Sequence, residues 1–146
     1  MKYYLTCSAQ VMIVTLLTYS FPAHSSYNKT QINQLNRLQR RAKKIISVGN
    51  IFDIDQQLKR ECVMMVKKCL NSELNCDIFN TYFKLSNHKF QTRNNNQIVK
   101  LPPVKLETAK RGFFFNGGSL YNALPLEIRK IRNMKQFSRA ISKHCF

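Results

Sequence analysis

Three cysteines recur at intervals of seven residues, at Cys62, Cys69 and Cys76. Thiolates bind zinc, but structural zinc sites use a close pair such as C-x2-C or C-x4-C together with a second pair, and the sequence has neither. The interval of seven instead places Cys62 and Cys69 on one face of a helix. We therefore expect these cysteines to be buried as small apolar side chains rather than to bind a metal.

Two carboxylates, Asp53 and Asp55, stand two residues apart, a spacing that can share a divalent cation. A third carboxylate and the glycine of a calcium loop are missing, so the pair is better suited to the first turn of a helix. The histidines His24, His88 and His144 lie beside no patterned cysteine or aspartate, and we expect them at the surface. The motifs G-x-S-x-G and H-E-x-x-H and a glycine-rich phosphate loop are also missing. We therefore expect no catalytic residue, no metal and no cofactor.

Positive charge is the strongest chemical signal in the sequence. The 146 residues include 24 Lys and Arg against 7 Asp and Glu, a formal net charge of +17. Such an excess repels itself in a compact fold and indicates a polyanionic partner, which excludes the small acidic binding modules. The alternative is that a basic helix face is only solvated. We predict contacts with RNA or DNA phosphates from seven residues: Arg37, Arg40, Arg41, Lys44, Arg93, Lys110 and Arg111.

Helices must position most of these residues. Apolar residues at steps of three and four predict a helix of roughly five turns between residues 32 and 46. A second helix begins near Asp53 or Asp55 and buries Leu58, Cys62, Met65, Val66 and Cys69. A short third helix covers residues 78–83. The last helix begins after Asn133, which caps it, and buries Met134, Phe137 and Ile141.

Between the third and the last helix the pattern is irregular. Residues 86–97 are polar and predict an exposed loop. Residues 98–101 precede two prolines, which remove two backbone donors and allow only a short edge strand. A run of phenylalanines then ends at Gly117 and Gly118, a pair that can adopt positive φ. The predicted fold class is therefore mainly α: a small helical domain with one irregular β-prone segment near residues 98–116.

Residues 1–26 form an apolar segment that differs from the basic remainder, residues 27–146. The apolar run of residues 11–17 and the small residues Ala23 and Ser25 are typical of a signal peptide and its cleavage site. Polar residues interrupt the segment too often for a membrane-spanning helix. Cleavage would leave four cysteines, which can pair in three ways. One interpretation of the whole chain is therefore a small secreted basic protein with disulfides that binds acidic surfaces.

The order of several short motifs supports a different interpretation. Six segments of this sequence are similar to the patterns of one family, and their residues are given at the end of this paragraph. The family's own patterns are "LTYC-x-P-x-W", "LQRLQNRAARII", "YK-x-LNG", "TR-[SN]" and "K-x-SF-x-Y-x-GA-x-LWN-x-LP". Together they resemble the region after the catalytic palm in reverse transcriptases of non-LTR retrotransposons of the jockey and related clades. Ser20 stands where the family has Cys, and His24 and Tyr121 where it has Trp. The matching segments are LLTYSFP at 16–22, LNRLQRRAKKII at 35–46, VKKCLN at 66–71, TRN at 92–94, AKRGFFFNGG at 109–118 and LYNALP at 120–125.

The resemblance implies a carboxy-terminal, thumb-side fragment that holds nucleic acid by its backbone. It implies no enzyme activity for this chain alone, because the family's palm carries the metal-binding aspartates and this sequence has no adjacent pair of aspartates. The implied partners are RNA or DNA and the polymerase core of a parent element, with no small-molecule substrate. The implied location is the nucleus or cytoplasm, and residues 1–26 become part of the region after the palm.

Overall fold

The computed structural model describes residues 27–46, 54–74, 76–86 and 97–144, and within them the chain is mainly helical, which confirms the predicted fold class. The amino-terminal segment of residues 1–26 and the loop residue Arg93 lie outside this part. The helices are α3 (Lys29–Ile46), α4 (Ile54–Leu70), α5 (Asp77–Tyr82), α6 (Glu107–Arg111), α7 (Phe113–Ala123), α8 (Leu126–Arg129) and α9 (Met134–Lys143).

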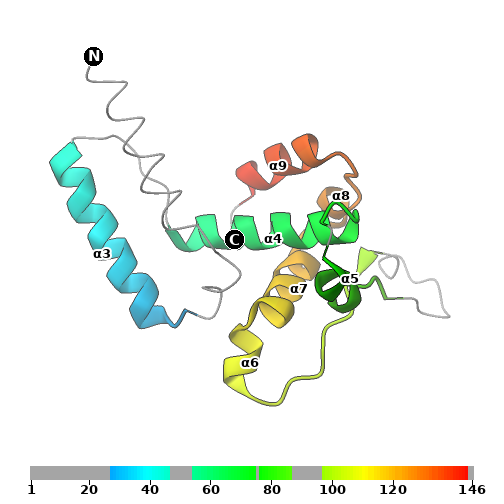
Figure 1. Cartoon of the computed structure of the whole chain (residues 1–146). Helices are drawn as coiled ribbons and strands as arrows, with labels where there is room; N and C mark the ends of the chain where they lie inside the picture. Colours follow the sequence, from blue (N-terminus) through cyan, green and yellow to red (C-terminus); the bar gives the residue numbers. More distant parts are fainter. Residues whose placement is uncertain (1–26, 47–53, 75, 87–96, 145–146) are drawn as a thin grey trace.

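Helix α4 crosses the centre of the molecule, with α9 on one side and α7 on the other (Figure 1). It begins at Ile54, which confirms the start predicted near Asp53 or Asp55. Asp55 in its first turn forms an ion pair with Lys59 at 2.6 Å. The predicted apolar stripe is buried except for Met65, which is partly buried, and Val63 is buried as well. Because α3, α5, α7 and α9 all contact α4, its stripe forms the main core of the described domain.

Helix α3 lies along one side of the molecule and has the predicted length of five turns (Figure 1). A reciprocal pair of hydrogen bonds holds its first turn: the Gln31 N–H donates to Asn28 Oδ1 and the Asn28 N–H donates to Gln31 Oε1, both at 2.9 Å. This arrangement is a capping box, and it satisfies two backbone donors that the helix itself leaves unpaired. On the inner face Leu35 packs against the core and Gln39 is buried.

From Glu107 onward the segment predicted to be β-prone belongs to α6 and α7, so that prediction is wrong beyond residue 106. Only Val99 pairs as a strand would, in an isolated antiparallel bridge with Leu85. The glycine prediction is also wrong: Gly117 and Gly118 lie inside α7, and no glycine in the described ranges has positive φ. Their role is close approach, because a Cβ at Gly117 would lie 3.1 Å from Val66 Cγ2 and 3.2 Å from Cys62 Sγ. A side chain there would push α7 away from α4.

Asn122 binds the backbone of Val99 as a neighbouring strand would. The Val99 N–H donates to Asn122 Oδ1 at 2.8 Å, and Asn122 Nδ2 donates to the Val99 carbonyl at 2.9 Å. The bridge partner Leu85 lies on the other edge, where the Ser86 and Lys100 N–H groups donate to Ile98 and Lys84 carbonyls. Asn122 therefore satisfies the open edge of Val99 and fastens this segment to α7.

Helix α9 confirms the prediction made from its cap. The Asn133 side chain accepts hydrogen bonds from the Lys135 N–H at 2.9 Å and the Gln136 N–H at 3.2 Å. Phe137 and Ile141 are buried against the core, and Arg60 of α4 donates to the Ser142 carbonyl at 3.1 Å. A good N-cap followed by apolar residues four and eight positions along the chain was therefore a sufficient signal for this helix.

Cys62 and Cys69 are buried in α4, as predicted from their spacing, whereas Cys76, just before α5, is only partly buried. Burial raises the pKa of the Cys62 thiol from 9.0 to about 12 and that of Cys69 to about 11. In the described ranges no three His, Cys, Asp or Glu side chains gather where they could hold a metal ion. Among the same residues, none of the helices has the length and apolar character needed to cross a membrane.

We expect the free energy of unfolding to fall as the pH rises above about 9, because the unfolded chain ionises its thiols there while the folded chain keeps Cys62 protonated. Cys62 alone accounts for a loss of about 1.4 kcal/mol by about pH 10. The raised pKa of Tyr121 acts in the same direction, and the lowered pKa of Lys67 opposes it. Urea unfolding under reducing conditions at about pH 7 and about pH 10 measures this loss of stability. In Cys62→Ala the free energy of unfolding should depend less on pH than in the wild type. An unchanged dependence in that variant would contradict the assignment.

Candidate nucleic-acid interface

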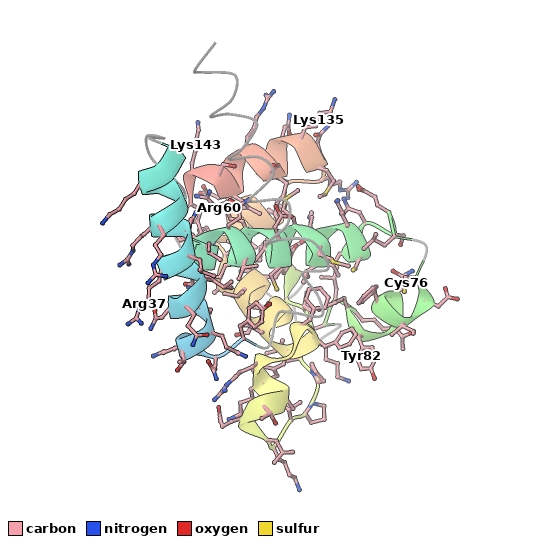
Figure 2. All side chains as sticks on the ribbon, turned by 60° about the vertical axis from the view of Figure 1, so that its left-hand side comes forward. Arg37, Arg60, Cys76, Tyr82, Lys135 and Lys143 are labelled. Carbon is pink, nitrogen blue, oxygen red and sulfur yellow. The ribbon has the colours of Figure 1, made fainter. Side chains whose placement is uncertain are left out.

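Four of the predicted phosphate-binding residues form one stripe on the outer face of α3. They are exposed and occupy positions i, i+3, i+4 and i+7 of the helix, a span of about 10 Å. This stripe lies opposite the inner face that carries Leu35 and Gln39, and Figure 2 shows Arg37 directed away from the other helices. We call these residues the basic stripe: Arg37, Arg40, Arg41 and Lys44.

No carboxylate is built into α3 to neutralise the basic stripe. The sequence from Lys29 to Ile46 contains neither Asp nor Glu. Within the described ranges the ion pairs join Lys59 to Asp55 and Lys110 to Glu107, so neither of them involves the stripe. Like charges spaced a helical turn apart repel one another, and an external anion relieves that repulsion. The stripe therefore suits a ligand that carries several negative charges in a row.

The other predicted contact residues are placed less favourably. Arg111 is exposed at the end of α6, next to Lys110. Lys110 Nζ lies 2.5 Å from Glu107 Oε1, and this hydrogen bond and its charge lower the pKa of the Glu107 carboxyl. The Lys110 charge is thus offset by a neighbour. Arg93 lies outside the described residues, so the structure brings together the residues of α3 and leaves Arg111 as a separate exposed cation.

Two further basic residues are buried, which the sequence analysis did not foresee. Lys67 and Arg129 are each 5% exposed. Lys67 Nζ donates to the Arg129 carbonyl at 3.0 Å and lies 5.3 Å from the centroid of the Phe137 ring. Burial lowers the Lys67 pKa, and the charge of Arg132 lowers it further. A signal was present in the sequence, because Lys67 follows the buried Val63 by four residues and so shares its face of α4.

These two cations fasten the core and are not open to a ligand. Arg129 Nη1 donates to the Gln97 carbonyl at 3.2 Å, which ties α8 to the segment that carries Val99. The Tyr121 hydroxyl also lies 3.4 Å from the Arg129 carbonyl. The net charge of the chain therefore overstates the charge at its surface, and the exposed groups of α3 become the principal candidates for anion binding.

Aromatic rings gather where α5 meets the start of α7. Phe113 is buried, as expected for a core residue, and its ring lies 5.3 Å from that of Phe83 and 5.8 Å from that of Phe79, centroid to centroid. Phe114 is partly buried and lies 4.3 Å from the ring of Tyr82. Tyr82 itself is 50% exposed at the end of α5.

Comparison with known proteins adds no family to this description. No family model, no curated protein and no solved structure matches the chain. The class that the fold and the surface define is a small, strongly basic, mainly helical domain.

Proposed function

We propose that the basic stripe of α3 binds the sugar–phosphate backbone of RNA or DNA. One observation carries the proposal: four exposed cations share a face of a helix that contains no acidic residue. Arginine guanidinium groups bind phosphate oxygens in a bidentate manner, and each neutralised phosphate releases condensed counterions into solution. All four side chains of the stripe are cations, and contacts between cations and phosphates favour binding that does not depend on base sequence.

We further propose that the chain derives from the carboxy-terminal, thumb-side region of a non-LTR retrotransposon reverse transcriptase and has no polymerase activity of its own. The order of the family-like motifs supports this origin. The segment LNRLQRRAKKII lies in α3 and the segment LYNALP, which contains the backbone-binding Asn122, closes α7. The proposed role is to hold nucleic acid, with the polymerase core of a parent element as a further partner.

Reversing two charges of the stripe tests the proposed binding. We expect Arg40→Glu with Arg41→Glu to weaken the binding of a short duplex roughly 10- to 100-fold, because two phosphate contacts are lost and repulsion replaces them. Fluorescence anisotropy with a labelled duplex at fixed salt measures this change.

The matched control reverses Lys135 and Arg139 to Glu. These residues are exposed on α9, lie one turn apart, and change the net charge by the same amount as the α3 pair. The control should retain most of the affinity. Equal losses in the two variants would show that net charge alone drives binding, and an unchanged affinity in the α3 variant would remove the stripe from the interface.

A further inference from the structure

Tyr82 and Phe114 form an exposed aromatic platform at the junction of α5 and α7. Their ring centroids lie 4.3 Å apart with an angle of 31° between the ring planes, so one face of Tyr82 rests on Phe114. Tyr82 is nevertheless 50% exposed, which leaves its other face open. Phe79 and Phe83 lie 5.7 and 5.8 Å from Phe114 and hold that ring from behind. The platform is therefore a fixed surface and not a mobile side chain.

Two exposed cations lie close to the platform residues along the chain. Lys84 is exposed two residues after Tyr82, and Arg111 is exposed three residues before Phe114. Asp77 at the start of α5 is the exposed carboxylate of the same helix, and Glu107 is already paired with Lys110. An exposed π face with exposed cations a few residues away along the chain is the combination that binds single-stranded nucleic acid, in which bases stack on the ring while Lys and Arg contact the phosphates.

We propose that the outer face of Tyr82 stacks on an unpaired base of single-stranded RNA or DNA. The inference rests on the proposed function, because the basic stripe supplies the part of the affinity that is the same for single strands and duplexes. Tyr82 and Arg37 lie on opposite sides of the molecule in Figure 2, so the two sites contact different parts of a ligand. The bases inside a duplex are already stacked on each other and offer no face to the ring. The platform therefore selects single strands over duplexes.

The test compares a short oligouridylate with a duplex of equal length, by fluorescence anisotropy on the whole chain. We expect Tyr82→Leu to lower the affinity for the single strand by about 5- to 100-fold, the effect of losing one base–aromatic stack, and to leave duplex affinity unchanged. Leucine keeps an apolar contact with Phe114, so the variant should retain the fold. Tyr82→Phe keeps the π face and should bind as the wild type does.

Ile78→Ala is the matched control, because Ile78 is exposed one turn earlier on the same face of α5. It should leave both affinities unchanged. The inference is overturned if Tyr82→Leu binds the single strand normally, if it loses duplex affinity equally, or if Ile78→Ala is as harmful. If the wild type binds neither ligand, the proposed function fails first; if it binds the duplex and Tyr82→Leu has no effect, only the platform is excluded.

Discussion

Replacing Phe137 with alanine is expected to lower the free energy of unfolding by about 3–5 kcal/mol, a large share of the stability of a small domain. Phe137 is fully buried on α9 and joins that helix to α4. The substitution opens a cavity and also removes the ring that lies 5.3 Å from Lys67 Nζ, leaving a buried ammonium with less compensation. Urea unfolding followed by circular dichroism measures the change.

Two variants of the same helix separate these contributions. Gln136→Ala alters the exposed neighbour and should change the free energy by less than about 0.5 kcal/mol. Phe137→Leu keeps most of the apolar volume but loses the π face, so its cost should lie between those of the other two variants. A loss below about 1 kcal/mol for Phe137→Ala would contradict the packing of α9 on α4.

Asn122→Ala is expected to cost about 2–4 kcal/mol, because it leaves both the N–H and the carbonyl of Val99 without their partners. Both hydrogen bonds are short, at 2.8 and 2.9 Å, and Val99 is buried. The loss should appear first as faster hydrogen exchange of the Val99 amide and then as lower global stability.

Asn122→Asp is the sharper comparison, since aspartate keeps the acceptor for the Val99 N–H and loses the donor for its carbonyl. At neutral pH it places a carboxylate beside that carbonyl, so we expect it to be at least as destabilising as alanine and to recover on acidification. The neighbour Ala123 is exposed, and Ala123→Ser serves as a control with little effect. If Asn122→Ala is as stable as the wild type, the two hydrogen bonds between Asn122 and the Val99 backbone do not stabilise the fold.

The helices that could be predicted well from the sequence are those with a local signal, such as regular apolar spacing or a capping residue. In α3 and α4 the apolar spacing repeats over several turns, and in α9 the capping Asn133 fixes the start. Only the last turn of helix α7, which ends before Pro125, was predicted; its earlier part was missed because its apolar residues follow no helical period and its two glycines disfavour a helix on propensity. Those glycines are explained only by tertiary contacts, because Val66 and Cys62 of α4 approach Gly117 and Leu101 approaches Gly118. In α7 the packing of the helix against its neighbours outweighs the low helix propensity of its glycines.

The candidate interface shows the same division. The spacing of the basic stripe follows directly from helical geometry, so Arg37, Arg40, Arg41 and Lys44 could be assigned to one face before the fold was known. The burial of Lys67 and Arg129 and the exposure of Tyr82 depend on which helices meet, and composition cannot convey that. A residue type suggests a role, but burial decides whether a ligand can reach it.

The most direct test of the central claim is the salt dependence of duplex binding by the wild type and by the Arg40→Glu, Arg41→Glu variant. The slope of log K against log salt concentration counts the phosphates that the protein neutralises, at about 0.9 for each contact on B-DNA. If the basic stripe makes those contacts, the variant's slope should be shallower by about 2. Equal slopes for the two proteins would contradict the claim that α3 binds the nucleic-acid backbone.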